Sequence, residues 1–225
     1  DLINIHDALI QSKTKLNWLL DNIKKMSSWL YEISNNNFYP LFNDSSYNIT
    51  YPPQIILKYV KDNYGFNFKG NKSNILKDSG IYYYKSKDIK LWFDCGNLGP
   101  DFLLAHAHND SLNIELLLNN EHILTDSGIY DYEAGKSLKW RPYFRSSKAH
   151  NVITINNTEP NEVWGSFRVG KRGYTKIEKY SKNFIEASHN SYKSIGVKLK
   201  RKINIDNLNK VTIEDKIEFK KKKNI

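Results

Sequence analysis

The chain has 225 residues, of which 40% are hydrophobic and 13% aromatic, a composition that excludes a disordered protein. Its formal net charge of +10 indicates attraction for polyanions, namely nucleic acid, an anionic membrane surface or an acidic polysaccharide, although a generally Lys-rich surface explains the same charge. No apolar run reaches the roughly 18 residues of a membrane-spanning helix, so we expect no membrane insertion.

The first part of the chain predicts helices. Residues 8–34 carry one apolar stripe at three- and four-residue steps, formed by Leu16, Leu19, Ile23, Met26, Leu30 and Ile33. A loop over Asn35–Pro53 follows, and then a second helix over Pro53–Asn63, with Gly65 placed as its C-terminal cap. We interpret residues 1–70 as the tail of a larger helical domain, because a helical hairpin of this size is too small to fold alone.

From Gly80 onward the sequence predicts short strands separated by turns. The predicted strands are Ile81–Tyr84, Ile89–Asp94, Leu112–Leu118, His122–Asp126, Val152–Asn156, Tyr174–Tyr180, Phe184–His189, Gly196–Ile205 and Lys210–Phe219. Strands at this spacing favour an antiparallel β-sandwich or barrel over residues 71–225. The fold class is therefore mainly β with N-terminal helices.

The two ends of the chain indicate a piece of a longer protein. It begins at Asp1 without Met or a signal peptide, and its last predicted strand is followed by the run Lys220–Lys223. We therefore expect truncation at both ends. The single cysteine, Cys95, excludes an internal disulfide and leaves the redox compartment open.

The segment Ala105–Asp110 contains an H-x-H pair, His106 and His108. In an extended strand, residues i and i+2 point to one face, and these two would lie about 7 Å apart along it. Such a pair suits a metal ion, although hydrogen-bonded histidines at the end of a sheet explain the same pattern.

Two further groups strengthen the prediction of a metal site. Asp126 ends a predicted hairpin strand, and antiparallel pairing would bring it back beside His108. His150 begins another predicted strand. Two imidazoles and one carboxylate suit Zn²⁺ with water in the fourth position. A turn-forming Asp before Ser-Gly is the alternative for Asp126.

Several motifs, in order and spacing, resemble the C-terminal module of the heparinase II/III-type polysaccharide lyases. They are Phe42–Ser45, Leu98–Asp110, Leu124–Tyr132, Tyr143–Val152 and Glu162–Arg168. The resemblance covers roughly residues 35–220, and it is closest to members found with surface-polysaccharide loci. It implies an (α/α) toroid followed by an antiparallel β-sandwich, with the first residues of this chain as the last helical hairpin of the toroid.

The resemblance also implies a reaction, the β-elimination of uronic-acid polysaccharides. A base removes the proton next to the uronate carboxylate, and an acid protonates the departing oxygen. That proton is acidic only when the carboxylate charge is neutralised. The main catalytic Tyr of the family and its Asn or His partner lie in the toroid, and their segments are missing here. We therefore expect this fragment alone to be inactive.

Position by position, the resemblance implies site residues. His108, Asp126 and His150 match ligands of a structural Zn²⁺, and His106 matches the histidine that the sandwich contributes to the catalytic cleft, for proton transfer or carboxylate neutralisation. The further candidates are Tyr143 for catalysis and Arg141, Arg145 and Asn109 for substrate binding. A structural role for the arginines and the tyrosine is equally open, and Glu162 and Arg168 form a candidate structural pair.

Other functions compete with the lyase. A non-catalytic carbohydrate-binding or assembly module of a surface-polysaccharide locus would keep the sandwich and the metal. A nucleic-acid binder would need clustered basic residues or a recognition motif, which the sequence lacks, and a cupin-like metal dioxygenase fits the order of the motifs less well. The expected partners are an acidic polysaccharide and the missing toroid. The resemblance places the protein in the periplasm or cell envelope.

Overall fold

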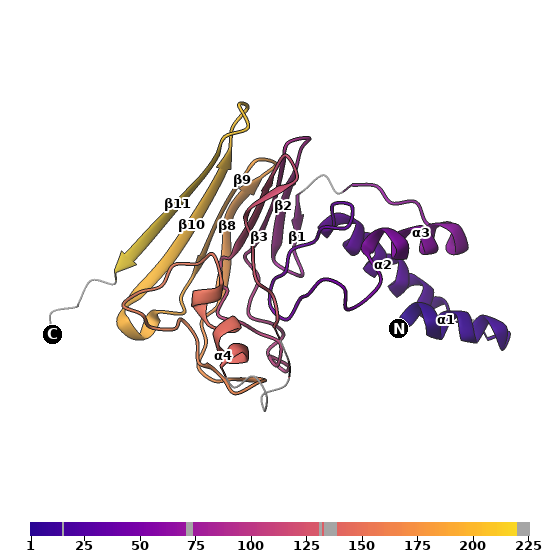
Figure 1. Cartoon of the computed structure of the whole chain (residues 1–225), viewed down its shortest axis with the longest axis horizontal. Helices are drawn as coiled ribbons and strands as arrows, with labels where there is room; N and C mark the ends of the chain where they lie inside the picture. The colour runs from indigo at the N-terminus through magenta and orange to yellow at the C-terminus, as the bar shows by residue number, and fades with distance from the viewer. Residues whose placement is uncertain (15, 71–73, 131, 133–138, 220–225) are drawn as a thin grey trace. The chain divides into compact units, whose positions relative to one another are not determined.

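A computed structural model describes residues 1–14, 16–70, 74–130, 132 and 139–219 of the chain (Figure 1). The lysine run at 220–223, and residue 131 of the motif at 124–132, lie outside the described residues. The chain forms two compact units. One comprises Asp1–Tyr39 and Asn48–Asn71, and the other comprises Pro40–Tyr47 and Lys72–Ile225.

The first unit contains three helices, α1 (Leu2–Gln11), α2 (Asn17–Ile33) and α3 (Pro53–Tyr64). The prediction of a single helix over 8–34 is wrong, because Lys13 has φ 59°. A left-handed residue cannot continue a right-handed helix, so the chain turns between α1 and α2. The buried centre of this unit consists of Leu19, Ile23 and Val60.

The end of α3 follows the predicted pattern. Pro53 occupies its first turn, and Gly65 ends it with φ 69° in the left-handed region. A residue without a Cβ adopts this backbone at no steric cost, which is why glycine is common just after helices.

In its described residues, the second unit contains two large antiparallel sheets and a two-stranded one. The first has the order β1-β2-β3-β4-β5 and is formed by Ile75–Leu76, Ile81–Lys85, Ile89–Asp94, Ile114–Leu118 and Glu121–Leu124. The second has the order β11-β10-β9-β8 and is formed by Val211–Phe219, Val197–Ile205, Phe184–His189 and Thr175–Ser181. The antiparallel β-sandwich expected from the spacing of the strands is thereby confirmed.

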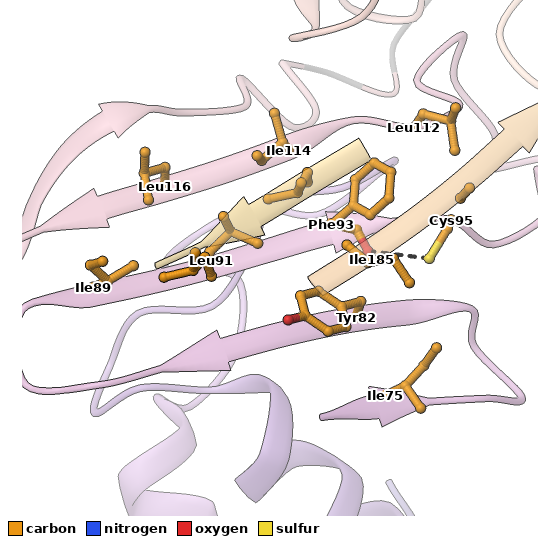
Figure 2. Close-up of a cluster of buried hydrophobic side chains, with 13 residues drawn as sticks. Ile75, Tyr82, Ile89, Leu91, Phe93, Cys95, Leu112, Ile114, Leu116 and Ile185 are labelled. Carbon is orange, nitrogen blue, oxygen red and sulfur yellow. Dashed lines mark hydrogen bonds between the residues drawn. The ribbon is translucent and has the colours of Figure 1, made fainter. Parts of the chain in front are cut away.

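The two sheets share one apolar core. Its buried members come from both sheets, and Figure 2 shows Leu91 and Phe93 of β3 in the same cluster as Ile185 of β9. Strand β10 illustrates the cause, because its residues alternate between buried and half-buried along its whole length. The alternation places one face of the strand in the core, and burial of that apolar face stabilises the packing of the two sheets.

The extended conformation considered for His106 and His108 is wrong, and two predicted strands differ. The segment with the two histidines lies in turns and loop. The predicted strand Leu112–Leu118 begins only at Ile114, as β4, because Leu112 has φ 64° and the amide of Asn113 donates to the carbonyl of Asp110. The predicted strand Val152–Asn156 is replaced by a turn, since Asn156 and Asn157 both have left-handed backbones and leave only an isolated bridge between Ile155 and Thr158.

The connection between β5 and β8 contains elements that the sequence patterns did not predict. They are the short helix α4 (Trp140–Phe144), the 3-10 turn η1 (Ser147–Ala149) and a hairpin of β6 (Val163–Trp164) with β7 (Arg168–Val169). This connection carries several of the predicted site residues. Their geometry therefore depends on loops and not on the sheets.

Candidate functional site

His106 and His108 differ in environment despite their H-x-H spacing. The side chain of His106 is 60% exposed, whereas that of His108 is fully buried. The amide of Ala107 donates to the carbonyl of Leu104 in a turn, so the two side chains do not share one face of a strand as expected. Both rings nevertheless bind the same carboxylate.

That carboxylate belongs to Asp44. Its Oδ2 lies 2.9 Å from Nδ1 of His106, and its Oδ1 lies 2.8 Å from Nε2 of His108. The guanidinium of Arg141 donates to both oxygens. Burial alone would raise the pKa of Asp44, but the hydrogen bonds from His108, Arg141 and His106 hold that pKa well below its usual range. Asp44 is therefore a buried, ionised centre that joins three predicted site residues.

The segment Pro40–Tyr47 brings Asp44 into the second unit, and several hydrogen bonds hold it. The amide of Leu41 donates to the carboxylate of Glu115, and that of Asn43 donates to Oδ2 of Asp110 at 3.1 Å. The amide of His108 in turn donates to Oδ1 of Asn43 at 3.1 Å. Burial is the main cause that raises the pKa of Glu115 to about 8.

Gly128 allows the same segment to approach the Asp-Ser-Gly motif. The carbonyl of Ser45 accepts a hydrogen bond from the amide of Ile129 at 2.9 Å. A Cβ at Gly128 would lie 2.2 Å from that carbonyl oxygen, and the residue has φ 58°. The glycine is therefore needed both for the turn and for the passage of the segment.

Arg141 is buried, and its position in α4 is set from two sides. Besides Asp44, it donates to the carbonyl of Ser166 through Nε at 3.2 Å and through a terminal nitrogen at 2.9 Å. Its guanidinium carbon lies 5.3 Å from the ring centroid of Tyr132 and 5.4 Å from that of Phe167. The predicted substrate-binding arginine thus holds Asp44, and its bidentate geometry fixes the plane of the carboxylate.

The exposed part of the site surrounds His106. The ring centroids of Tyr132 and Phe167 lie 6.0 Å and 6.3 Å from that of His106, and these two aromatic rings stack on each other at 5.7 Å. Both aromatic residues are a little under half exposed. An exposed imidazole with two partly exposed rings edge-on to it is suited to contact with a sugar.

His150 and Asp126 form a second imidazole–carboxylate pair, and both side chains are fully buried. Nδ1 of His150 lies 2.6 Å from Oδ2 of Asp126, which also accepts from the side chain of Asn113. The other oxygen of Asp126 accepts from the amide of Gly128 at 2.7 Å. Burial alone would lower the pKa of His150, but the contact with Asp126 raises it above its usual value.

The rings of His108 and His150 lie side by side, with centroids 5.3 Å apart. In each ring one nitrogen binds a carboxylate, and the other, Nδ1 of His108 or Nε2 of His150, is buried without a hydrogen-bond partner. Buried nitrogens of this kind are costly unless something binds them, and metal-bound histidines commonly hold a carboxylate on the far nitrogen. These two imidazoles therefore fit a metal ion.

The third predicted ligand, Asp126, binds His150 in this structure. Within the described ranges, no group of three or more His, Cys, Asp or Glu side chains is arranged to hold a metal ion. The arrangement supplies two ring nitrogens directly, and it places Asp126 behind one of them. The assignment of the three ligands stays a prediction.

The remaining predicted site residues lie in structural positions or apart from Asp44. Arg145 is buried and donates to the carbonyls of Ala107 at 3.0 Å and Gly165 at 2.8 Å. Burial, followed by the charge of Arg141, lowers the pKa of Arg145 to about 10. Buried Asn109 joins two loops through reciprocal hydrogen bonds with the backbone of Asn161.

Tyr143 is 43% exposed and lies edge-on to the rings of Trp140 and Phe144. Glu162 and Arg168, the candidate structural pair, each contact another residue. Glu162 accepts from the amide of Lys171 at 2.9 Å, and the guanidinium of Arg168 lies 4.8 Å from the ring centroid of Trp164.

Asp44 is the site residue to which the sequence interpretation assigned no role. Its signal was present, because Phe42–Ser45 was one of the motifs of the resemblance. A charged residue in a loop rich in Asn and Ser carries no periodicity, so only the fold identifies its partners.

The fold and the site are those of an antiparallel β-sandwich with two imidazole–carboxylate pairs in its loops. Comparison with known proteins identifies the family. The sequence model of the family described as "Heparinase II/III-like, C-terminal" matches residues 69–225. The chain therefore belongs to the heparinase II/III-like family through its C-terminal domain. A search of curated proteins gave no match.

Solved structures share the fold. The Heparinase III-BT4657 gene product superposes with a TM-score of 0.71 at 18% identity over 91% of this chain and 33% of its own. The heparan sulfate lyase HepC from Pedobacter heparinus gives 0.68 at 17% identity over 97% of this chain and 36% of its own. The chain thus spans about a third of the length of these structures.

The helices within the described ranges do not meet the requirements of a membrane span. None of them is both long enough and apolar enough to cross a bilayer.

Proposed function

We propose that this chain is part of a polysaccharide lyase that cleaves uronic-acid-containing polysaccharide by β-elimination. The observation that carries the proposal is His106, an exposed imidazole that a buried carboxylate holds at 2.9 Å, with two exposed aromatic rings edge-on to it. Membership of the heparinase II/III-like family supports it. Named relatives of the same fold include a heparan sulfate lyase.

The reaction needs a group that handles a proton next to a carboxylate. The base takes the proton from the carbon beside the uronate carboxylate, a C=C bond forms, and the bond to the glycosidic oxygen breaks. His106 is the described group best placed for such contact, because Asp44 and Arg141 lie behind it in the protein. Tyr143, the other predicted catalytic residue, is exposed on α4.

The charge of the chain supports an acidic substrate. A net charge of +10 attracts a polyanion, and the ammonium of Lys139 lies 5.1 Å from the ring centroid of exposed Trp140 in the connection that bears the site. Acidic polysaccharides combine negative charge with sugar surfaces that stack on such rings. Heparan sulfate, alginate, chondroitin-like chains and bacterial capsule polymers all belong to this class.

The proposed function extends beyond this chain. In the family, the sandwich completes a cleft with a toroid that supplies the main catalytic tyrosine, and the helices of the first unit are the proposed last hairpin of that toroid. The natural protein would therefore combine this chain with further helices. We also propose the periplasm or cell envelope as its location, because surface polysaccharides are found there.

A structural Zn²⁺ is part of the proposal. Nδ1 of His108 and Nε2 of His150 are the nitrogens that would hold it, with Asp126 beside them. Such an ion would tie the loop of His106 and His108 to the loop after η1, and it would keep both loops in place around the cleft.

The activity is tested with the full-length natural protein. Each acidic polymer is added, and absorbance near the ultraviolet edge reports the new C=C bond. We expect product with at least one uronate polymer, and a loss of turnover for His106→Ala but not for His122→Ala, a matched exposed histidine on β5. Binding without any unsaturated product would overturn the lyase and favour the non-catalytic carbohydrate-binding module.

A further inference from the structure

We propose that Asp44 is the positioning residue of His106. It holds Nδ1 of the imidazole as the protonated nitrogen and thereby presents Nε2 to the substrate as the proton acceptor. This inference rests on the proposed lyase function and deepens it, because it chooses between the two roles left open for His106.

Asp44 cannot take part in the reaction directly. Its side chain is 4% exposed, and both of its oxygens are occupied. Oδ1 accepts from His108 and Arg141, and Oδ2 accepts from His106 and Arg141. A carboxylate whose two oxygens each accept two hydrogen bonds, with almost no exposure, acts through its partners.

The partner that reaches solvent is His106. A carboxylate oxygen accepts hydrogen bonds, so the contact at 2.9 Å requires a proton on Nδ1. In the neutral ring Nε2 then carries the lone pair, on a side chain that is 60% exposed. Neutralising a substrate carboxylate through a neutral ring would need the opposite tautomer, with the proton on Nε2.

The surroundings keep the pair in one orientation. Arg141 holds the carboxylate plane from behind, and the rings of Tyr132 and Phe167 lie edge-on to that of His106, at 76° in both cases. The backbone on both sides of Asp44 is tied to the sandwich through the amide of Asn43 and the carbonyl of Ser45. A fixed carboxylate therefore sets both the tautomer and the direction of the imidazole.

The proposed step conserves protons and electrons. Nε2 of His106 takes the proton from the carbon next to the uronate carboxylate, and the released electron pair forms the C=C bond. The bond to the glycosidic oxygen breaks, and that oxygen takes a proton from a second acid of the full-length protein. Asp44 stays ionised throughout and stabilises the imidazolium that forms.

The first test measures the tautomer directly. Nitrogen-15 chemical shifts of the His106 ring in the 225-residue chain, at a pH where the ring is neutral, should show the proton on Nδ1. In Asp44→Asn, the amide can donate to Nδ1, and the proton should move to Nε2. The control is Asp101→Asn. Asp101 is an exposed aspartate on the loop that carries His106, and it is paired with Arg172, so its replacement should leave the His106 signals unchanged.

The second test uses turnover of the full-length protein. Asp44→Asn should lower kcat by at least about 100-fold with a small change in KM, since the wrong tautomer disables the base without removing substrate contacts. The loss should vanish in a His106→Ala background, because Asp44 acts through His106. Zinc is supplied in excess and its content is measured, since Asp44 also binds His108.

The outcomes separate the two proposals. A wild-type ring with the proton on Nε2, or equal losses from Asp44→Asn with and without His106, would overturn the role of Asp44 alone. The wild-type tautomer decides this question even if Asp44→Asn does not fold. A wild-type protein that forms no unsaturated product from any uronate polymer would instead overturn the lyase function.

Discussion

Two buried imidazole nitrogens in the loops of the sandwich, Nδ1 of His108 and Nε2 of His150, would be held together by a bound metal ion. We expect about one zinc ion per chain, and we expect His108→Ala and His150→Ala each to lose it, because each removes one of these nitrogens. Elemental analysis of the purified chain, before and after treatment with a chelator, measures this loss. The melting temperature should fall together with the zinc content, since a bound ion stabilises the folded state.

The control for the zinc experiment is His122→Ala, which removes an exposed imidazole from β5. This variant should keep its zinc and its melting temperature. If His108→Ala and His150→Ala also keep full zinc content, the ion is held elsewhere or is adventitious, and the assignment of these ligands is wrong.

His189 on β9 makes the stability depend on pH in a predictable direction. Burial, followed by the charge of Arg201, lowers the pKa of His189 to about 4. In the unfolded chain this imidazole binds a proton near pH 6.5, whereas in the folded chain it stays neutral down to about pH 4. The free energy of unfolding therefore has its full value above pH 6.5 and falls as the pH is lowered to about 4. The loss is up to about 3 kcal/mol.

Chemical denaturation at a series of pH values between 4 and 7 measures the slope of the free energy of unfolding against pH. In His189→Gln the contribution from this residue should disappear, whereas His122→Gln should keep the slope of the wild type. An unchanged slope in His189→Gln would show that other groups cause the acid sensitivity.

The turn before β2 depends on a close approach between two glycines. Gly80 has φ 68°, and a Cβ there would lie 2.2 Å from the Cα of Gly96, while the amide of Cys95 donates to the carbonyl of Gly80. Gly80→Ala therefore adds a backbone clash to the strain of the left-handed conformation. We expect it to lower the free energy of unfolding by about 3 kcal/mol or more.

Gly196 provides the matched comparison within the same unit. It has φ 73°, but nothing lies within 4 Å of a Cβ built on it. Gly196→Ala should therefore cost only the backbone strain of about 1–2 kcal/mol. Urea denaturation of both variants checks the difference, and equal losses would mean that the backbone near Gly96 relaxes to make room.

The two compact units differ in how much apolar surface they bury. The core of the second unit draws on both sheets, whereas the described cluster of the first unit has Leu19, Ile23 and Val60 as its buried members, and α1 has no buried residue. Local opening costs less free energy where few apolar contacts are lost. We therefore expect amide hydrogen exchange to be fastest in α1, slower in α2 and slowest in β3 and β10.

Exchange followed by mass spectrometry resolves these segments. The comparison of α1 with α2 is internal, because both are helices of the same unit and α2 carries Leu19 and Ile23. Protection of α1 equal to that of β3 would mean that burial within each unit does not set its local stability.

The amino-acid sequence by itself was enough to predict the sandwich, because the pattern that marks a strand is local. In β10 every second residue is buried over nine positions, and all of these buried residues except Arg201 are apolar, so backbone geometry converts the pattern into one buried face. The prediction failed where backbone conformation, and not side-chain polarity, decides the structure. Lys13, Leu112 and Asn156 adopt left-handed conformations that interrupt the predicted helix and strands, and no periodic pattern marks them.

The site required the tertiary structure. The sequence motifs placed His106, His108 and His150 among the candidates, but Asp44 lies 62 residues before His106 and contacts it only because Pro40–Tyr47 is bound to the sandwich. Whether an imidazole is exposed or buried, and which of its nitrogens meets a carboxylate, depends on such long-range hydrogen bonds. Motifs record which residues are present, whereas the packing of loops decides which atoms meet.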